Sequence, residues 1–174
     1  MPGFYDGNNQ WKIRFMPTET GTWEFTTSSN LAPLSDQKGS FECIHAKESV
    51  HGVVTAADQF QFVYSDGTQY HPVGTTCYVW NLQEPALEKK TLETLKKGPF
   101  NKIRFCIYPK RYTFNYNEPQ NYPFPGEVKE KWDPEYQDDY TPRPRDTWWD
   151  FDHFNPEYFQ HIDECVLALR NLRI

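Results

Sequence analysis

The most constraining feature of the sequence is a strand–helix–strand pattern over residues 72–107. PVGTTCYVW is short, apolar and β-branched, which predicts a buried strand. A predicted helix then begins at Pro85, carries leucines along one side and ends at Gly98. NKIRFCIY predicts the second strand. A helical crossover makes its two strands parallel, so residues 73–80 and 102–108 are expected to pair in one sheet. A parallel sheet is covered on both faces, so this unit needs further partners.

Size and charge limit the classes of protein that fit. The chain has 174 residues and a formal net charge of −6, which suits one domain or two small ones. The acidic balance argues against nucleic acid as the main partner. No window approaches the ~20 apolar residues of a membrane span. The first residues, MPGFYDGNN, resemble no signal sequence, so we expect no membrane partner and a cytoplasmic location.

The cysteines and histidines show no pattern typical of a metal site. No CxxC spacing occurs, and no histidine is paired with a second histidine or a cysteine at ligand spacing. We therefore expect free, buried thiols in a reducing compartment, with no metal and no cofactor. The residues concerned are Cys43, Cys77, Cys106, Cys165, His71, His153 and His161.

Residues 1–57 are predicted to form a first, all-β domain. WKIRFM and TWEFTT alternate apolar and polar residues around the turn PTETG, which predicts a hairpin, and FECIH predicts a third strand. The pattern is typical of part of a β-sandwich, or of a simple antiparallel sheet edge. The strand expected before residue 3 is absent from this sequence, so we expect the first strands of the sandwich to lie outside it or to come from another chain. Open edges of this kind would allow a homo-oligomer to form by strand pairing.

Residues 58–174 are predicted to form the second domain. It opens with a hairpin over residues 58–71, in which Asp66 and Gly67 favour a type I′ turn. Residues 108–154 are rich in proline and in aromatic residues, which make up 17% of the whole chain, so we predict an ordered lid or binding loop. A helix over residues 155–173 follows, capped by Asn155. Its predicted apolar stripe is Phe159, Ile162, Val166 and Leu169.

Several of these segments resemble a known family. GFYDGNNQWKIRFMPTETGTWEFTTSSN resembles the later half of the DUF5060-type β-sandwich that precedes a class of bacterial glycoside hydrolases. FVYSDGTQYHPVGTTCYVW and PFNKIRFCIYPKRYTFNYNEPQNYPF resemble the opening of the TIM barrel that follows it, of the DUF4038/DUF5605-like type. WDFDHFNPEYFQHIDECVLALRNLRI resembles the next helix of that barrel. The resemblance covers almost the whole chain.

The resemblance implies a fold and a function. The fold would be α/β with an N-terminal all-β part: a partial immunoglobulin-like β-sandwich, then the first two βα units of a (β/α)8 barrel. A whole barrel takes about 250 residues, so this chain would be an N-terminal fragment. The catalytic carboxylates of such enzymes lie on later strands, so we expect none here and a carbohydrate as the partner.

Candidate substrate-binding residues lie where the two parallel strands are expected to end. Arg104 would be a charge in a buried strand, either facing the ligand end of the barrel or in a structural ion pair. Trp80 would stack on a sugar or pack in the core, and tandem tryptophans would form a sugar subsite or anchor a loop. The full set is Trp80, Asn81, Arg104, Lys110, Tyr112, Trp148 and Trp149.

Three functions follow, in order of preference. The first is the N-terminal portion of a glycoside hydrolase. The second is a non-catalytic carbohydrate-binding module that uses the aromatic loop. The third is an assembly protein whose open sheet edges pair with a second copy.

Overall fold

The computed structural model describes residues 1–58, 60–110, 115, 117–128 and 147–174. By its internal contacts the chain divides into two compact units, which are described separately below. The first unit comprises Met1–Pro2 and Ile13–His71, and the second comprises Gly3–Lys12 and Pro72–Ile174. The sequence placed a boundary near residue 57, whereas this division falls after His71. The hairpin of residues 58–71 therefore groups with the first unit.

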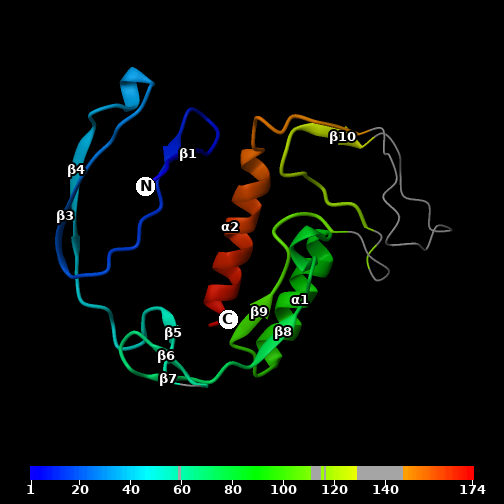
Figure 1. Ribbon diagram of the computed structural model, residues 1–174. Coiled ribbons are helices and arrows are strands. Elements are labelled where there is room, and N and C mark those ends of the chain that lie inside the picture. Colours follow the sequence, from blue (N-terminus) through cyan, green and yellow to red (C-terminus); the bar gives the residue numbers. More distant parts are fainter. Residues whose placement is uncertain (59, 111–114, 116, 129–146) are drawn as a thin grey trace. The chain divides into compact units, whose positions relative to one another are not determined.

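The second unit contains the expected strand–helix–strand element. Strands β8 (Gly74–Thr76) and β9 (Lys102–Arg104) pair in parallel, and helix α1 (Pro85–Lys97) connects them (Figure 1). The predicted parallel pairing of the segments 73–80 and 102–108 is thus confirmed, although each strand has only three residues, fewer than the sequence predicted. After β8 the chain turns into a 3-10 helix, η2 (Trp80–Leu82), in place of the strand end expected there.

Helix α2 (Pro156–Asn171) begins as the sequence predicts. The Asn155 side chain accepts a hydrogen bond from the Glu157 backbone N–H at 3.2 Å, and Pro156 occupies the first turn. The predicted apolar stripe is only partly right. Val166 is 48% exposed, and Cys165 is buried in its place. The buried stripe is Tyr158, Ile162, Cys165 and Leu169.

The core of the second unit lies between η2, α1 and α2. One cluster joins Val79 and Leu82 to Tyr158 and Ile162 of α2. A second cluster joins Trp80 and Leu95 to Cys165 and Leu169. Within the described chain, every buried apolar residue other than Pro123 belongs to one of these two clusters. Cys77 and Phe105, which follow β8 and β9 directly, pack against the second cluster, so the core lies next to the carboxyl ends of both strands.

A short hairpin near the N-terminus also belongs to the second unit. Strands β1 (Phe4–Tyr5) and β2 (Trp11–Lys12) pair antiparallel around a turn with positive φ at Gly7, Asn8 and Asn9. The Gln160 amide of α2 donates to the Asp6 carbonyl at 2.7 Å, which ties the hairpin to the helix. The predicted pairing of residues 11–16 with 22–27 is wrong, because β2 takes β1 as its partner.

The first unit consists of small antiparallel sheets. Strands β3 (Gly21–Thr26) and β4 (Lys38–Cys43) pair over six residues, and η1 (Ala32–Leu34) lies in their connection. Strands β5 (Val54–Ala56), β6 (Phe62–Tyr64) and β7 (Gln69–Tyr70) form a three-stranded sheet.

The predicted hairpin of residues 58–71 is present, but its turn differs. The Gly67 N–H donates to the Tyr64 carbonyl at 2.9 Å, and Gly67 alone in this turn has positive φ, +86°. A type I′ turn needs positive φ at both central residues. This loop is a type I turn followed by a glycine in the left-handed region, which also suits the twist of a hairpin.

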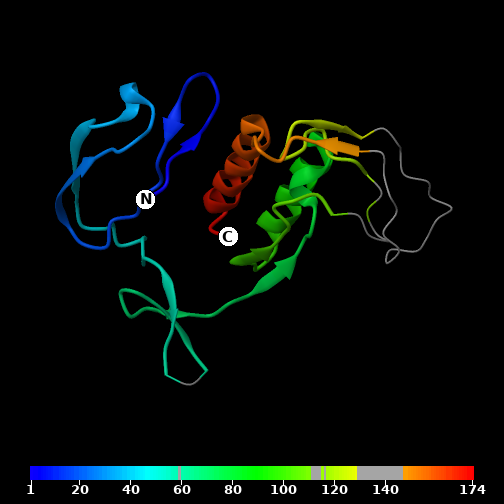
Figure 2. The same cartoon turned by 45° about the horizontal axis from the view of Figure 1, so that its top comes forward.

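The long insertion is described in part. Strands β10 (Gly126–Val128) and β11 (Thr147–Trp149) pair antiparallel, and Figure 2 shows them side by side in yellow and orange. The rest of the predicted lid, residues 111–114, 116 and 129–146, lies outside the described residues. Within the described part of the chain, no helix is long and apolar enough to span a membrane.

Candidate functional site

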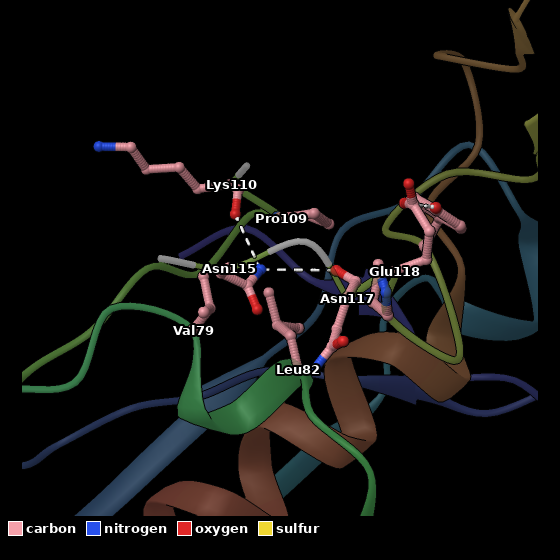
Figure 3. Close-up of a pocket in the computed structure, with 9 residues that line it drawn as sticks. Val79, Leu82, Pro109, Lys110, Asn115, Asn117 and Glu118 are labelled. Carbon is pink, nitrogen blue, oxygen red and sulfur yellow. Dashed lines mark hydrogen bonds between the residues drawn. The ribbon is translucent and has the colours of Figure 1, made fainter. Parts of the chain in front are cut away.

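A pocket of about 140 Å³ lies beyond the carboxyl ends of β8 and β9 (Figure 3). Parallel α/β folds bind their ligands at this end of the sheet, because the loops there are free to vary without disturbing the strands. The pocket wall comes from the segment after β8 and from the loop after β9. It is lined by Val79, Leu82, Pro109, Lys110, Asn115, Asn117, Glu118, Pro119 and Tyr122.

Three carboxamides hold the pocket wall together. The buried Gln83 amide donates to the Val79 carbonyl and to Asn115 Oδ1, both at 3.0 Å. The Asn117 amide donates to Gln83 Oε1 at 2.7 Å. The Asn115 amide reaches the Lys110 and Asn117 carbonyls at 3.4 and 3.5 Å (Figure 3). The loop after β9 is thereby fixed to the segment after β8 by neutral groups.

Glu118 and Tyr122 give the pocket a paired acid and phenol. The Tyr122 hydroxyl donates to the Glu118 carboxylate. Burial raises the pKa of Tyr122, so the phenol stays protonated at neutral pH and remains a donor. The Tyr122 carbonyl accepts from the Asn155 amide at 2.9 Å, which links this wall to the start of α2. This wall therefore offers neutral and charged hydrogen-bonding groups to a polar ligand.

A second pocket of about 260 Å³ adjoins the first, since both are lined by Pro109 and Tyr122. Its other walls are Pro123, Phe124, Trp149 and Phe151. The rings of Tyr122 and Trp149 lie 4.7 Å apart at 47°. Phe151 is 69% exposed. Exposed aromatic faces beside a polar pocket suit a ligand that has both apolar faces and polar groups.

Arg104 and Lys110 lie over the same ring. Their charged ends are 5.2 and 5.0 Å from the centroid of the Tyr78 ring, within the range of a cation–π contact. Arg104 is exposed in β9, whereas the sequence predicted a buried charge. The reason is the pleat: Ile103 packs with the core, so its neighbour Arg104 points to the opposite face of this two-stranded sheet.

The other predicted residues are placed as follows. Trp80 is 4% exposed and packs in the core, with its ring 6.1 Å from that of Phe105. Asn81 is fully buried, and its amide donates to the Cys106 carbonyl at 3.2 Å. Trp149 lines the second pocket and Lys110 the first. Figure 3 shows the Lys110 side chain directed away from the other labelled residues.

The remaining two candidates are described less fully. Tyr112 lies outside the described residues. The backbone of Trp148 lies in β11, opposite Glu127. The predicted set is therefore not gathered into one pocket: two members line the pockets, two lie in the core, and Arg104 lies against Tyr78.

Sequence reasoning missed the residues that build most of the pocket. Gln83, Asn115, Asn117 and Glu118 were not among the predicted site residues. A signal was present in NYNEPQNY, where amides, a carboxylate and a tyrosine follow a predicted parallel strand closely.

No metal-ligand cluster was expected, yet one group of such side chains converges. Within the described part of the chain, Glu88, His161 and Cys165 lie close enough to share an ion, between α1 and α2 and apart from both pockets. All four cysteines are free, and Cys165 alone of them is fully buried.

Comparisons with known proteins agree with the sequence resemblance in part. Residues 1–30 match a family described as a domain of unknown function, DUF5060. No curated protein matches the chain. A crystal structure of a "putative glycoside hydrolase" from Bacteroides vulgatus is 38% identical, with a TM-score of 0.84. The match covers 99% of this chain and 32% of that one. The chain is thus similar, along nearly its whole length, to about a third of a larger protein bearing that name.

Proposed function

We propose that this chain is the N-terminal portion of a glycoside hydrolase that acts on polysaccharide or oligosaccharide. In this proposal the all-β part belongs to an immunoglobulin-like sandwich of the DUF5060 type. The segment from β8 to α2 supplies the first two βα units of a DUF4038-like (β/α)8 barrel. Such a barrel takes about 250 residues, so most of it lies outside these 174 residues.

The observation that carries the proposal is the parallel pair β8–β9, with two adjoining pockets beyond its carboxyl ends. Barrel enzymes build their active sites from the loops at that end. The 38% identical structure from Bacteroides vulgatus, by its name, supports the same class of reaction.

The pockets would contribute sugar contacts. Tyr122 and Trp149 present aromatic rings for stacking against a sugar face. The Lys110 ammonium lies over the Tyr78 ring, outside the pocket, and would donate hydrogen bonds to sugar hydroxyls there. Arg104 would orient a carboxylate or a sugar hydroxyl inside the completed barrel. Trp80 and Asn81 would act indirectly, by packing beneath the loops that carry these groups, and Tyr112 and Trp148 remain candidates in the same insertion.

The catalytic pair would come from outside this chain. Glycoside hydrolysis uses two carboxyl groups about 5 Å apart in retaining enzymes and roughly 6.5–9.5 Å apart in inverting ones. Glu118 is the carboxylate that lines the first pocket, and it accepts a hydrogen bond from the Tyr122 hydroxyl. A lone carboxylate can bind sugar hydroxyls but cannot supply both roles.

The test compares this chain with a longer protein that includes the downstream sequence. We expect the longer protein to release sugars from a panel of polysaccharides and chromogenic glycosides, and this chain to release none. Hydrolysis by the short chain would overturn our placement of the catalytic residues. Absence of hydrolysis by both, across the panel, would overturn the enzyme assignment.

A carbohydrate-binding module without catalysis is the second candidate, favoured by the aromatic walls of the second pocket. Titration calorimetry of this chain with oligosaccharides would test it, with Trp149→Ala as the pocket variant. Loss of one stacking ring should weaken binding about tenfold, which is about 1.4 kcal/mol. Trp11→Ala, at an exposed tryptophan of β2, is the matched control and should change nothing. Binding without hydrolysis by the longer protein would select the module.

A further inference from the structure

Three side chains of different chemistry converge between α1 and α2. Glu88 comes from α1, whereas His161 and Cys165 lie one turn apart on α2. His161 Nε2 is 2.9 Å from Glu88 Oε1 and 3.6 Å from Cys165 Sγ. One carboxylate, one imidazole and one thiol atom all lie within 4.8 Å of one another. Neither pocket includes any of these residues, so the proposed function gives them no role.

The spacing of these atoms resembles that of ligands around a tetrahedral zinc ion. Zinc bonds of about 2.0–2.3 Å place neighbouring donor atoms roughly 3.3–3.8 Å apart. The separation between His161 Nε2 and Cys165 Sγ lies within that range, whereas the 2.9 Å to Glu88 Oε1 is a hydrogen-bond distance, so the carboxylate would have to move a few tenths of an ångström away to admit an ion. The Asn81 carbonyl oxygen, 3.0 Å from the same nitrogen, or a water molecule would complete four ligands.

The surroundings suit a metal-bound imidazole. Two ligands at positions i and i+4 of a helix lie on one face, the arrangement by which helices commonly present a pair of zinc ligands. His161 Nδ1 lies 3.9 Å from a carboxylate oxygen of Glu164. In the structure Nε2 faces two acceptors, Glu88 Oε1 and the Asn81 carbonyl, so it carries the ring proton. A metal at Nε2 requires the other tautomer, with the proton on Nδ1, on the side of Glu164.

We propose that Glu88, His161 and Cys165 form a zinc site that joins α1 to α2. The set of one nitrogen, one sulfur and one oxygen donor selects zinc over magnesium or calcium, which prefer oxygen ligands alone. The ion would replace the hydrogen bonds among these side chains and would link two helices that belong to one core. Its role is structural, since it lies apart from both pockets.

Binding must displace the thiol proton. Burial, together with the charges of Glu88 and Glu164, raises the pKa of Cys165 to about 12. Zinc binds the thiolate, so the Cys165 S–H bond breaks, a sulfur–zinc bond forms and the proton passes to solvent. Without a metal, the same three residues form only a hydrogen-bonded group, and the experiment must separate these two states.

Cobalt(II) is a suitable probe, because a cobalt–thiolate bond gives a charge-transfer band in the near ultraviolet. We expect one cobalt ion to bind per chain with this band, zinc to displace it, and zinc to raise the Tm of the chain. A variant with Cys43, Cys77 and Cys106 all changed to serine should keep the band, and C165S should lose it. E88Q and H161Q should each weaken cobalt binding at least tenfold, whereas His153→Gln, at an exposed histidine, should not.

A wild-type chain without a thiolate–cobalt band would overturn the proposal, and so would a band that persists in C165S. Circular dichroism would establish that each variant keeps its helices. If C165S fails to fold, the variant that retains Cys165 alone decides, since loss of the band there places the thiolate ligand elsewhere. None of these readouts depends on sugar binding or hydrolysis.

Discussion

Asn155 serves two elements with one side chain. Its Oδ1 accepts from the Glu157 N–H at the start of α2, and its amide donates to the Tyr122 carbonyl behind the first pocket. We expect Asn155→Ala to lower the free energy of unfolding by about 0.5–2 kcal/mol through loss of the cap. Asn155→Ser keeps a capping oxygen and should recover most of this. Urea unfolding followed by circular dichroism measures both, and equal losses in the two variants would contradict the capping argument.

Tyr158 should make stability fall at alkaline pH. Burial raises its pKa well above the usual 10.0, and its hydroxyl donates to the Ile107 carbonyl. Above pH 10 the unfolded chain loses this proton while the folded chain keeps it. The free energy of unfolding therefore falls as pH rises, by up to about 1.4 kcal/mol per pH unit.

Tyr158→Phe removes that titration and leaves the Ile107 carbonyl without this donor, at a cost of about 1–3 kcal/mol near neutral pH. The difference in the free energy of unfolding between the wild type and the variant, called the gap below, should therefore narrow above pH 10. Chemical unfolding at pH 7, 9, 10 and 11 measures the gap. A gap that stays constant across this series would show that Tyr158 titrates alike in both states.

At the scale of single residues, local rules predict helix ends better than side-chain burial. Asn155 and Pro156 were identified because capping depends only on neighbours in sequence. Trp80 was expected at a strand end, but the chain enters η2 there and buries the ring against Leu95 and Cys165. Those partners lie far along the chain, so no local pattern contains that information.

At the scale of elements, helix α2 offers the best test of how the core of the second unit packs. Its buried face runs through Tyr158, Ile162, Cys165 and Leu169, whereas the sequence favoured a face that includes Val166. Both faces follow helical spacing, and they differ by a rotation of one residue. Leu169→Ala should lower the free energy of unfolding by about 2–5 kcal/mol, because it leaves a cavity in the core. Val166→Ala, at a side chain 48% exposed, should cost less than about 1 kcal/mol.

Thermal and urea unfolding of the two variants, compared pairwise, would settle the rotation of α2. A larger loss of stability for Val166→Ala than for Leu169→Ala would support the face favoured by sequence.

The candidate site also combines features that follow from local sequence with features that depend on distant parts of the chain. The position of the pocket followed from strand order, whereas its lining by Asn115, Asn117 and Glu118 depends on how a long loop folds back.

Strand pairing in the first part of the chain shows why elements were easier to predict than their partners. Residues 11–12 alternate as a strand should, but the alternation does not say which neighbour they pair with. Three successive residues with positive φ, Gly7 to Asn9, close the turn between β1 and β2. Glycine and asparagine tolerate that region best, so GNN was a turn signal that outweighed PTETG.

At the scale of the whole molecule, the two units differ in how much they bury. The second unit has two apolar clusters between η2, α1 and α2. Among its described residues the first unit contains no buried apolar side chain, and its sheets have two and three strands. Small sheets without a packed face are marginally stable in water. Local unfolding should therefore begin in the first unit.

Hydrogen–deuterium exchange measures this difference directly. We expect the backbone amides of β3, β4 and β6 to exchange at least about tenfold faster than those of α1 and α2, because opening a small sheet exposes little apolar surface.

A homo-oligomer formed through the open sheet edges would give a different result in the same experiment. Pairing with a second copy would slow exchange in β3 and β4 as protein concentration rises, with a matching increase in mass by light scattering. Backbone amides that are protected equally in both units, at every protein concentration, would contradict the proposed instability of the first unit. Such a result would mean that the first unit resists local opening as a monomer, in spite of its small buried surface.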